Sequence, residues 1–309
     1  MKASFTVGIG RTGAAALFAA SVIGLVGPGQ ARAQVPNTCG GSTATIVGTE
    51  GDDLLAGTPG SDVILGLGGN DILSGMDGFD ILCGGEGNDA LAGGAQRDFL
   101  SGDGGDDSID GGAGSDVVFL LFAPGPMAVD LAVGTIVGWG TDTVTSVENV
   151  IGSGFADTVV GDANPNQVVG EAGHDLITGG GGGDKMTGSS GNDRLDGGAG
   201  SDTVYYTHSP RSVAVNLAAG TGRGWGADTL VSLEQVDGSR YADMLTGNSA
   251  INRLDGWLGP DRLFGRGGRD RLLGGAGRDR LDGGPGRDRL NGGPGIDVCV
   301  NGELVSRCP

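Results

Sequence analysis

A nine-residue unit runs through most of this 309-residue chain. Written G-x-x-G-x-D-x-U-x, with U a large aliphatic residue, it fits three uninterrupted blocks at 48–119, 152–205 and 238–300. The blocks hold eight, six and seven units. Position one is glycine in all 21 units, position six is aspartate in 19, and position eight is aliphatic in all but the last, where Cys299 stands. Such regularity predicts a repeat architecture in place of a compact globular core.

The spacing within the unit predicts how it folds. The segment x-U-x is a short strand, in which U faces one way and its two neighbours face the other. With U inward, two units make one coil of the chain, and the glycines form the bends. We therefore expect an all-β protein, a parallel β-roll or β-solenoid, with about ten rungs from the 21 units.

The same stacking brings the position-six aspartates into columns, because units i and i+2 lie one above the other. Carboxylates at this spacing repel each other and oppose stacking. A hard divalent cation between successive turns reverses that effect. Calcium takes 6–8 oxygens in flexible geometry and suits glycine-rich turns that present carbonyls, whereas magnesium demands a tighter octahedron. One aliphatic side chain per nine residues buries little apolar surface against the entropy of ordering the backbone, so we expect metal binding and folding to be one event.

The units closely resemble the calcium-binding nonapeptides of RTX proteins, as in "GGEGNDALA" at 84–92 and "GGAGSDVVF" at 111–119. This resemblance implies a parallel β-roll in which the position-six aspartate ligates calcium and turn carbonyls complete the shell. Asn166 and Asn252 depart from the pattern. The implied metal ligands are Asp53, Asp62, Asp71, Asp80, Asp89, Asp98, Asp107, Asp116, Asp157, Asp175, Asp184, Asp193, Asp202, Asp243, Asp261, Asp270, Asp279, Asp288 and Asp297. One ion between each stacked pair of units gives about 11–15 calcium ions per chain.

A longer duplication separates the blocks. Residues 120–151 and 206–237 are spacers related by an offset of 86 residues, with strand-like alternation and Gly-Trp-Gly turn signals. Residues 34–47 and 301–309 remain as N-terminal and C-terminal caps.

The N-terminus reads as a secretory signal peptide over 1–33. It has Lys2 and Arg11, an apolar stretch at 13–26, and "ARA" at 31–33 as a cleavage site near Ala33. We expect a secreted, extracellular chain that starts at about Gln34 and has no membrane span; an uncleaved membrane anchor is the alternative. Four cysteines in an exported protein should be oxidised. We favour Cys299–Cys308, which leaves Cys39–Cys83.

Composition narrows the function further. The net charge of −19 and pI near 4.2 argue against a nucleic-acid partner and suit a protein that gathers cations. No H-E-x-x-H or G-x-S-x-G motif occurs, and the histidines, His174 and His208, read as solvated polar residues, so we do not expect an enzyme. The prediction is a secreted calcium-binding protein with a structural or interaction role. A hydrolase or epimerase accessory chain is the less favoured reading.

Two surface features leave alternatives open. Arginine occupies position seven in five consecutive units: Arg253, Arg262, Arg271, Arg280 and Arg289. These arginines either bind an anionic polysaccharide or cell wall, or neutralise nearby aspartates, which we favour. In the first block position seven is apolar at Val63, Ile81, Phe99 and Val117. That stripe is either a partner surface or, as we slightly favour, covered by the 120–151 spacer.

Overall fold

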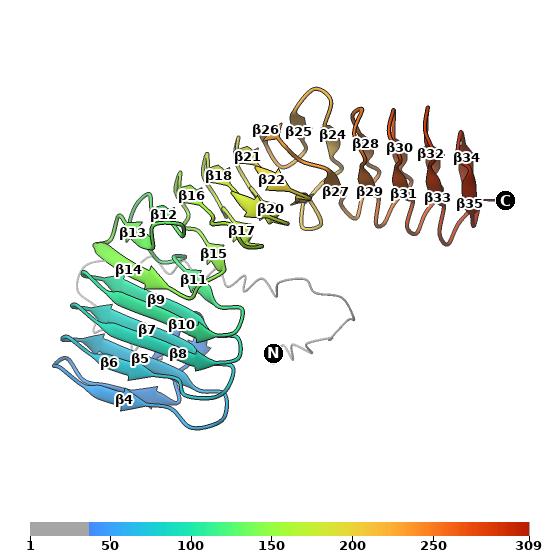
Figure 1. The fold of residues 1–309 in the computed structure, drawn as a ribbon. Helices are drawn as coiled ribbons and strands as arrows, with labels where there is room; N and C mark the ends of the chain where they lie inside the picture. The colour runs from blue at the N-terminus through green and yellow to red at the C-terminus, as the bar shows by residue number, and fades with distance from the viewer. Residues whose placement is uncertain (1–36, 309) are drawn as a thin grey trace, which may run out of the picture.

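The computed structural model describes residues 37–308, and the signal peptide predicted at 1–33 lies outside them. The described residues form an all-β, parallel β-solenoid of about 14 turns. They contain no helix, and hence none that could cross a membrane. Each turn of the solenoid contributes strands to two long sheets that face each other (Figure 1). The chain therefore has the fold class that its repeat predicts.

The first long sheet has fourteen strands, all paired in parallel in chain order. They are β3 (Ile46–Val47), β5 (Val63–Gly68), β7 (Ile81–Glu86), β9 (Phe99–Gly104), β11 (Val117–Phe119), β15 (Asn149–Ile151), β17 (Gln167–Val169), β20 (Lys185–Thr187), β23 (Thr203–Tyr205), β27 (Gln235–Asp237), β29 (Arg253–Asp255), β31 (Arg271–Leu273), β33 (Arg289–Asn291) and β35 (Leu304–Ser306).

The second long sheet has seventeen strands. They are β4 (Leu54–Ala56), β6 (Ile72–Ser74), β8 (Ala90–Ala95), β10 (Ser108–Ala113), β12 (Ala128–Asp130), β13 (Thr135–Val137), β14 (Thr141–Thr145), β16 (Thr158–Val160), β18 (Leu176–Thr178), β21 (Arg194–Asp196), β24 (Ala214–Asn216), β25 (Thr221–Arg223), β26 (Ala227–Val231), β28 (Met244–Thr246), β30 (Arg262–Phe264), β32 (Arg280–Asp282) and β34 (Val298–Val300). A small parallel pair, β19 (Gly181–Gly182) and β22 (Ala199–Gly200), joins two turns.

The core of the solenoid is the row of position-eight side chains between the two sheets. From Ile64 to Leu290 these side chains are at most 2% exposed. They stack in register, as Leu82 does on Leu100. Because a strand alternates its side chains, every inward U leaves positions seven and nine outside. One aliphatic residue per unit is thus enough to fill this narrow interior.

The duplicated spacers bend the solenoid. Each adds three strands to the seventeen-stranded sheet, β14–β13–β12 and then β26–β25–β24, as antiparallel meanders between parallel neighbours. Each adds only one strand, β15 or β27, to the opposite sheet. Two extra strands make this side of the solenoid longer than the other by roughly 10 Å, so the axis curves at each spacer. Both meanders lie on the convex side of the arc in Figure 1.

The number of turns differs from the prediction. The 21 units alone give about ten rungs, whereas the structure has about 14 turns. The additional rungs come from outside the repeat, because β3, β15, β27 and β35 extend the fourteen-stranded sheet. Caps and spacers therefore continue the coil of the chain through strands that lack the nine-residue signature.

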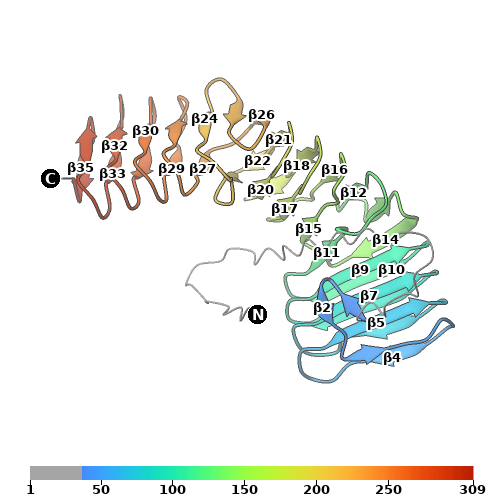
Figure 2. The ribbon, with the colours of Figure 1, turned by 180° about the vertical axis from the view of Figure 1, so that it is seen from behind.

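The N-terminal hairpin packs on part of the apolar stripe of the first block. Strands β1 (Thr38–Cys39) and β2 (Ser42–Thr43) pair antiparallel and lie across β5 and β7 (Figure 2). Cys39 is bonded to Cys83, and the two pack in one cluster with Ile81 and Phe119. The favoured expectation, cover by the 120–151 spacer, holds only in part, because Ile151 of the spacer also packs against this cluster. The N-terminal segment already carries apolar residues and a covalent tie to the same face.

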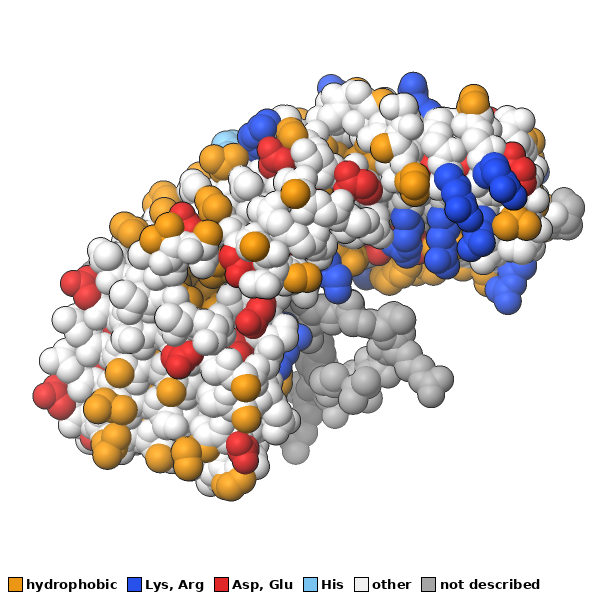
Figure 3. All heavy atoms as spheres, viewed as in Figure 1, with side chains coloured by type: hydrophobic (Ala, Val, Ile, Leu, Met, Phe, Trp, Pro, Cys, Tyr) orange, Lys and Arg blue, Asp and Glu red, His pale blue; other side chains and the backbone are white. Residues whose placement is uncertain are grey.

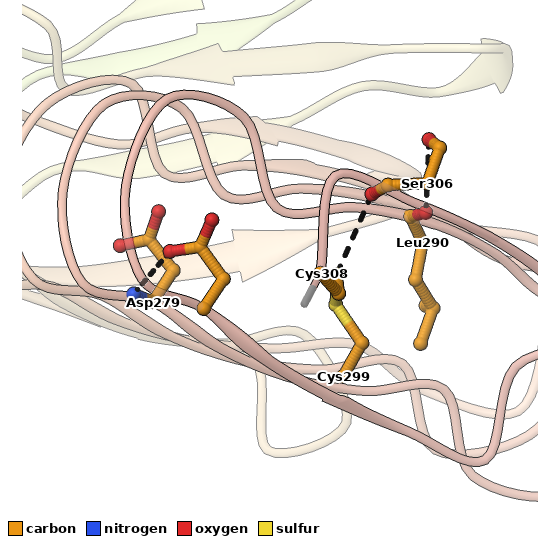
Figure 4. The surroundings of a disulfide bond; sticks show 6 residues. Asp279, Leu290, Cys299, Ser306 and Cys308 are labelled. Carbon is orange, nitrogen blue, oxygen red and sulfur yellow. Dashed lines mark hydrogen bonds between the residues drawn. A yellow bond between two sulfur atoms is a disulfide. The ribbon is translucent and has the colours of Figure 1, made fainter.

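The other end of the solenoid is closed by a second disulfide. Cys299 on β34 is bonded to Cys308, which follows β35 (Figure 4). Both disulfides have the pairing that the sequence favours, and each lies at one end of the described chain. A covalent tie that holds a terminal rung limits fraying, because the last strand of a stack has a neighbour on one side only.

Candidate metal centre

In fifteen of the units the position-six side chain is anchored through one carboxylate oxygen to the turn stacked before it. The N–H of Asp71 donates to Oδ1 of Asp89 at 2.7 Å, and the N–H of Asp98 donates to Oδ1 of Asp116 at 2.8 Å. Figure 4 shows the bond that Asp279 donates in the last block. The donor and acceptor are 18 residues apart, which is two units. The predicted carboxylate columns therefore exist, and one oxygen of each carboxylate is already occupied.

The other oxygen, Oδ2, is buried without a hydrogen-bond partner in fifteen of the nineteen aspartates. These fifteen side chains are at most 3% exposed. They are Asp71, Asp80, Asp89, Asp98, Asp107, Asp116, Asp175, Asp184, Asp193, Asp202, Asp261, Asp270, Asp279, Asp288 and Asp297. A buried, unpartnered polar atom is destabilising by about 1–3 kcal/mol, and more if it is charged. Fifteen identical cases indicate a common partner outside the polypeptide.

The position-one glycine leaves a cradle beside each Oδ2. A Cβ on Gly93 would lie 2.6 Å from Oδ2 of Asp98 and 2.6 Å from the carbonyl oxygen of Gly111, one turn further on. A Cβ on Gly274 would meet Asp279 and Gly292 in the same way. No carbon fits at such distances, so only glycine at position one lets the carboxylate oxygen and the carbonyl oxygen lie this close to the turn. The glycine thus keeps open a space that two oxygens face.

The ligand chemistry of the cradle fits calcium. No three His, Cys, Asp or Glu side chains converge on one point within residues 37–308. An ion bound there would therefore take most of its oxygens from backbone carbonyls. Calcium accepts six to eight such oxygens in flexible geometry, whereas magnesium retains water and requires a near-ideal octahedron.

The family profile of the RTX calcium-binding nonapeptide repeat matches residues 47–82, 84–118, 151–186, 178–206, 237–272 and 264–299, more than half of the chain. The chain belongs to the RTX calcium-binding nonapeptide repeat family. No curated protein matches it over its length or in part. The RTX units and the two disulfides are features typical of extracellular proteins.

The 21 RTX units fall into two structural classes, and the first two units of every block form the smaller class. In these six units the position-two N–H donates to the position-six side chain, as Thr58 does to Oδ2 of Asp62 at 2.6 Å. Asn166 and Asn252 accept the same bond. The others in this class are Asp53, Asp157 and Asp243. Four of the nineteen predicted ligands thus have Oδ2 occupied by their own turn.

Backbone conformation separates the same two classes. In all fifteen units with an unpartnered Oδ2, the position-two residue has a positive φ, for example 86° at Leu67 and 72° at Trp257. None of the six initial units has a positive φ there. A left-handed residue reverses the direction of its peptide groups, so the position-two N–H is withdrawn from the carboxylate. Leu, Met and Trp rarely adopt this conformation, which shows how strongly the stacked turns impose it.

Five acidic residues extend the columns beyond the repeat, and sequence reasoning missed them. Asp142 and Asp228 accept the N–H groups of Asp107 and Asp193 at 3.0 and 3.2 Å. The signal was present in "GWGTDTVT" (138–145) and "GWGADTLV" (224–231), which match the unit apart from its first glycine. The other three are glutamates, Glu148, Glu234 and Glu303, which accept the N–H groups of the last aspartates in their columns.

Burial raises the pKa of several aspartates in the columns. Desolvation raises the pKa of Asp98 to about 7 and that of Asp261 to about 8, and the single N–H bond that each accepts only partly offsets this. Burial also raises the pKa of Asp89 and Asp175, to about 6 and about 7, with nearby aspartates adding to the effect. Without a cation nearby, the ionised form of these carboxyl groups is therefore disfavoured in the folded chain.

We expect acidification to increase the order of the calcium-free protein. Because the pKa values are higher in the folded chain than in the unfolded one, the folded chain binds more protons between about pH 4 and pH 8, and its stability falls as pH rises through that window. Far-UV circular dichroism of calcium-free protein should show more β structure at pH 5 than at pH 8. An identical spectrum at both values would contradict this.

Proposed function

We propose that this protein is exported and becomes a rigid solenoid when it binds about fifteen calcium ions outside the cell. The observation that carries the proposal is the set of fifteen buried Oδ2 atoms without a partner, each beside a glycine cradle. Calcium would be held by the position-six aspartate together with turn carbonyls. The ion supplies positive charge between stacked turns, and the polypeptide supplies the spacing, the glycines and the left-handed position-two residues.

The role that we propose for the solenoid is structural or adhesive, without catalysis. His174 supports this reading, because its Nδ1 accepts the N–H of Asn192 at 2.9 Å. The same bond joins Asn88 to Asn70 in the first block. The histidine thus takes the place of an asparagine in a ladder between turns. Purified protein tested against protease and lipase substrates should release no product, and turnover would contradict the proposal.

Counting bound calcium tests the proposal directly. Equilibrium dialysis followed by elemental analysis should find about fifteen calcium ions per chain and few magnesium ions under the same conditions. Binding of only one or two calcium ions would overturn the assignment of the cradles. The calcium-saturated protein should also resist proteolysis, since a chain that folds on binding is protected only in the bound state.

A second function, binding of an anionic polysaccharide, is favoured by the arginines of the third block. Arg253 makes ion pairs with Asp237 and Asp255 at 2.6 and 2.8 Å. The other four position-seven arginines are exposed and make no ion pair with any described residue. Neutralisation of nearby aspartates, the favoured reading of the sequence, therefore accounts for one arginine of five.

The arginines also lie in register. Arg271 pairs with Arg289 in adjacent strands of one sheet, and Arg262 pairs with Arg280 in the other. Figure 3 shows basic side chains gathered over the C-terminal strands and few elsewhere on that face. Like charges about 4.8 Å apart repel each other and favour a polyanion that spans several rungs.

The test of this second function is retention on an immobilised acidic polysaccharide. Calcium-loaded protein should be retained and should elute earlier as salt rises. Replacing Arg271 and Arg289 by glutamine should shift elution to lower salt. Replacing Arg97 and Arg211, which lie outside the third block, provides the control. Equal elution of all forms would remove the hypothesis.

A further inference from the structure

Three segments outside the repeat share one short turn, two of them near the ends of the spacers and the third directly after the last block. The turns are Ser146-Val147-Glu148, Ser232-Leu233-Glu234 and Asn301-Gly302-Glu303, and each leads directly into a strand, β15, β27 or β35. The first residue of each turn has a positive φ of 55°, 49° or 54°. An RTX turn spends six residues between strands, whereas these turns spend three.

These short turns present the same two oxygens to the last cradles as an RTX unit would. The carbonyl oxygen of Ser146 faces the space where a Cβ of Gly111 would lie, 2.9 Å from Oδ2 of Asp116. Ser232 faces Gly197 and Asp202, and Asn301 faces Gly283 and Asp288, in the same arrangement. In each case the aspartate is fully buried and its Oδ2 has no partner.

The glutamates replace the aspartate of a following unit. Oε2 of Glu148 accepts the N–H of Asp116 at 2.8 Å, and Oε2 of Glu234 accepts the N–H of Asp202 at 3.0 Å. Glu303 accepts the N–H of Asp288. Elsewhere in the columns an aspartate Oδ1 makes this bond. Each glutamate directly precedes its strand, as position six does in an RTX unit, so it continues the column with a side chain one methylene longer.

We infer that these three turns form junction sites for divalent cations, in which a non-repeat carbonyl and a glutamate complete the cradle of the last aspartate. The inference rests on the proposed calcium binding by the RTX units. The junction sites continue the two columns from the first two blocks into the spacers, and they close one column at the C-terminus. The three blocks and their spacers are then joined by ions as well as by strands.

Not every acidic residue in the columns is free to bind a cation, and Asp228 of the second spacer is an example. Oδ2 of Asp228 accepts the hydroxyl of Tyr206 at 2.8 Å, so its second oxygen is already satisfied. A Cβ on Gly222 would overlap that hydroxyl, whereas the first spacer has Leu120 and Ile136 at the matching positions. The tyrosine and the glycine are thus matched to each other, and they make Asp228 a structural acceptor.

The experiment replaces all three glutamates by glutamine in the full chain. E148Q/E234Q/E303Q keeps an oxygen that can accept the aspartate N–H but removes the charge from each junction. Equilibrium dialysis should find three fewer tightly bound calcium ions than in the wild-type protein, or three sites weakened at least tenfold. A control variant, E50Q/E86Q, changes two exposed glutamates outside the three junctions and should keep the wild-type number.

An unchanged calcium count and affinity in the triple variant would overturn the inference and leave the glutamates as hydrogen-bond acceptors. If the wild-type protein itself binds no calcium, it is the proposed function that fails. Should the triple variant not fold in calcium, the single variant E303Q decides the matter, because only the last rung lies beyond it. It should bind one ion fewer, and the wild-type number would again overturn the inference.

Discussion

Replacing Asp98 by asparagine is expected to remove one calcium site and to lower the free energy of unfolding at saturating calcium. Asparagine keeps an oxygen for the N–H of Asp80, which now donates to Oδ1 at 2.9 Å. It places an amide group, however, where Oδ2 faces the cradle of Gly93. A site held at 100 times its dissociation constant contributes about 2.7 kcal/mol. Chemical denaturation in excess calcium should show a loss of that size.

The matched control is the same substitution at Asp62, which lies in the same sheet two rungs earlier. Oδ2 of Asp62 already accepts the N–H and hydroxyl of Thr58 at 2.6 and 2.9 Å. The chain itself carries asparagine at the equivalent positions of the later blocks, where Asn166 accepts the N–H of Asp162. D62N should therefore bind as much calcium as the wild-type protein. Equal losses in D62N and D98N would show that the two classes of unit do not differ in metal binding.

Removing calcium at neutral pH is expected to have the largest effect of all, the loss of most of the solenoid. Fifteen carboxylates would then lie buried, with one oxygen of each unpartnered and with other carboxylates one rung away. Like charges at that spacing repel, and burial adds the desolvation of each charged form. The apolar core opposes this with only one large side chain per nine residues.

The two disulfides do not prevent this unfolding. Cys39–Cys83 closes the first rungs and Cys299–Cys308 closes the last, so about 215 residues between them carry no covalent tie. In a chelator the protein should expand, and its hydrodynamic radius should approach that of an unfolded chain. Restoring calcium should reverse the change, since no covalent bond is altered. A compact particle in chelator would contradict the expectation.

Much of this fold could be predicted because the repeat imposes it locally. The period of nine places each U inward, and stacking by two units places the aspartates in columns, so Asp71 and Asp89 could be paired from their spacing. The cysteine pairing followed from position in the chain. The spacers were less predictable, because their meanders replace glycine-rich turns by antiparallel pairing, and strand alternation does not reveal which sheet receives the extra strands.

The sequence predicted that the aspartates form columns. It did not predict which of their Oδ2 atoms lack a hydrogen-bond partner. Aspartate at position six is the same residue in both classes of unit. The difference between Asp62 and Asp80 arises from the φ of position two, which the stacked turns impose. Residue type at position two is a poor guide, because Ser153 caps its aspartate while Ser189 is left-handed. Glu148 was missed because its turn is three residues shorter than the turn of an RTX unit.

Far-UV circular dichroism during a calcium titration of chelated protein is the most direct test that cations hold the columns together. We expect a disordered spectrum in chelator at neutral pH, a cooperative gain of β structure as calcium is added, and little gain with magnesium at equal concentration. A full β spectrum that persists in excess chelator would contradict it.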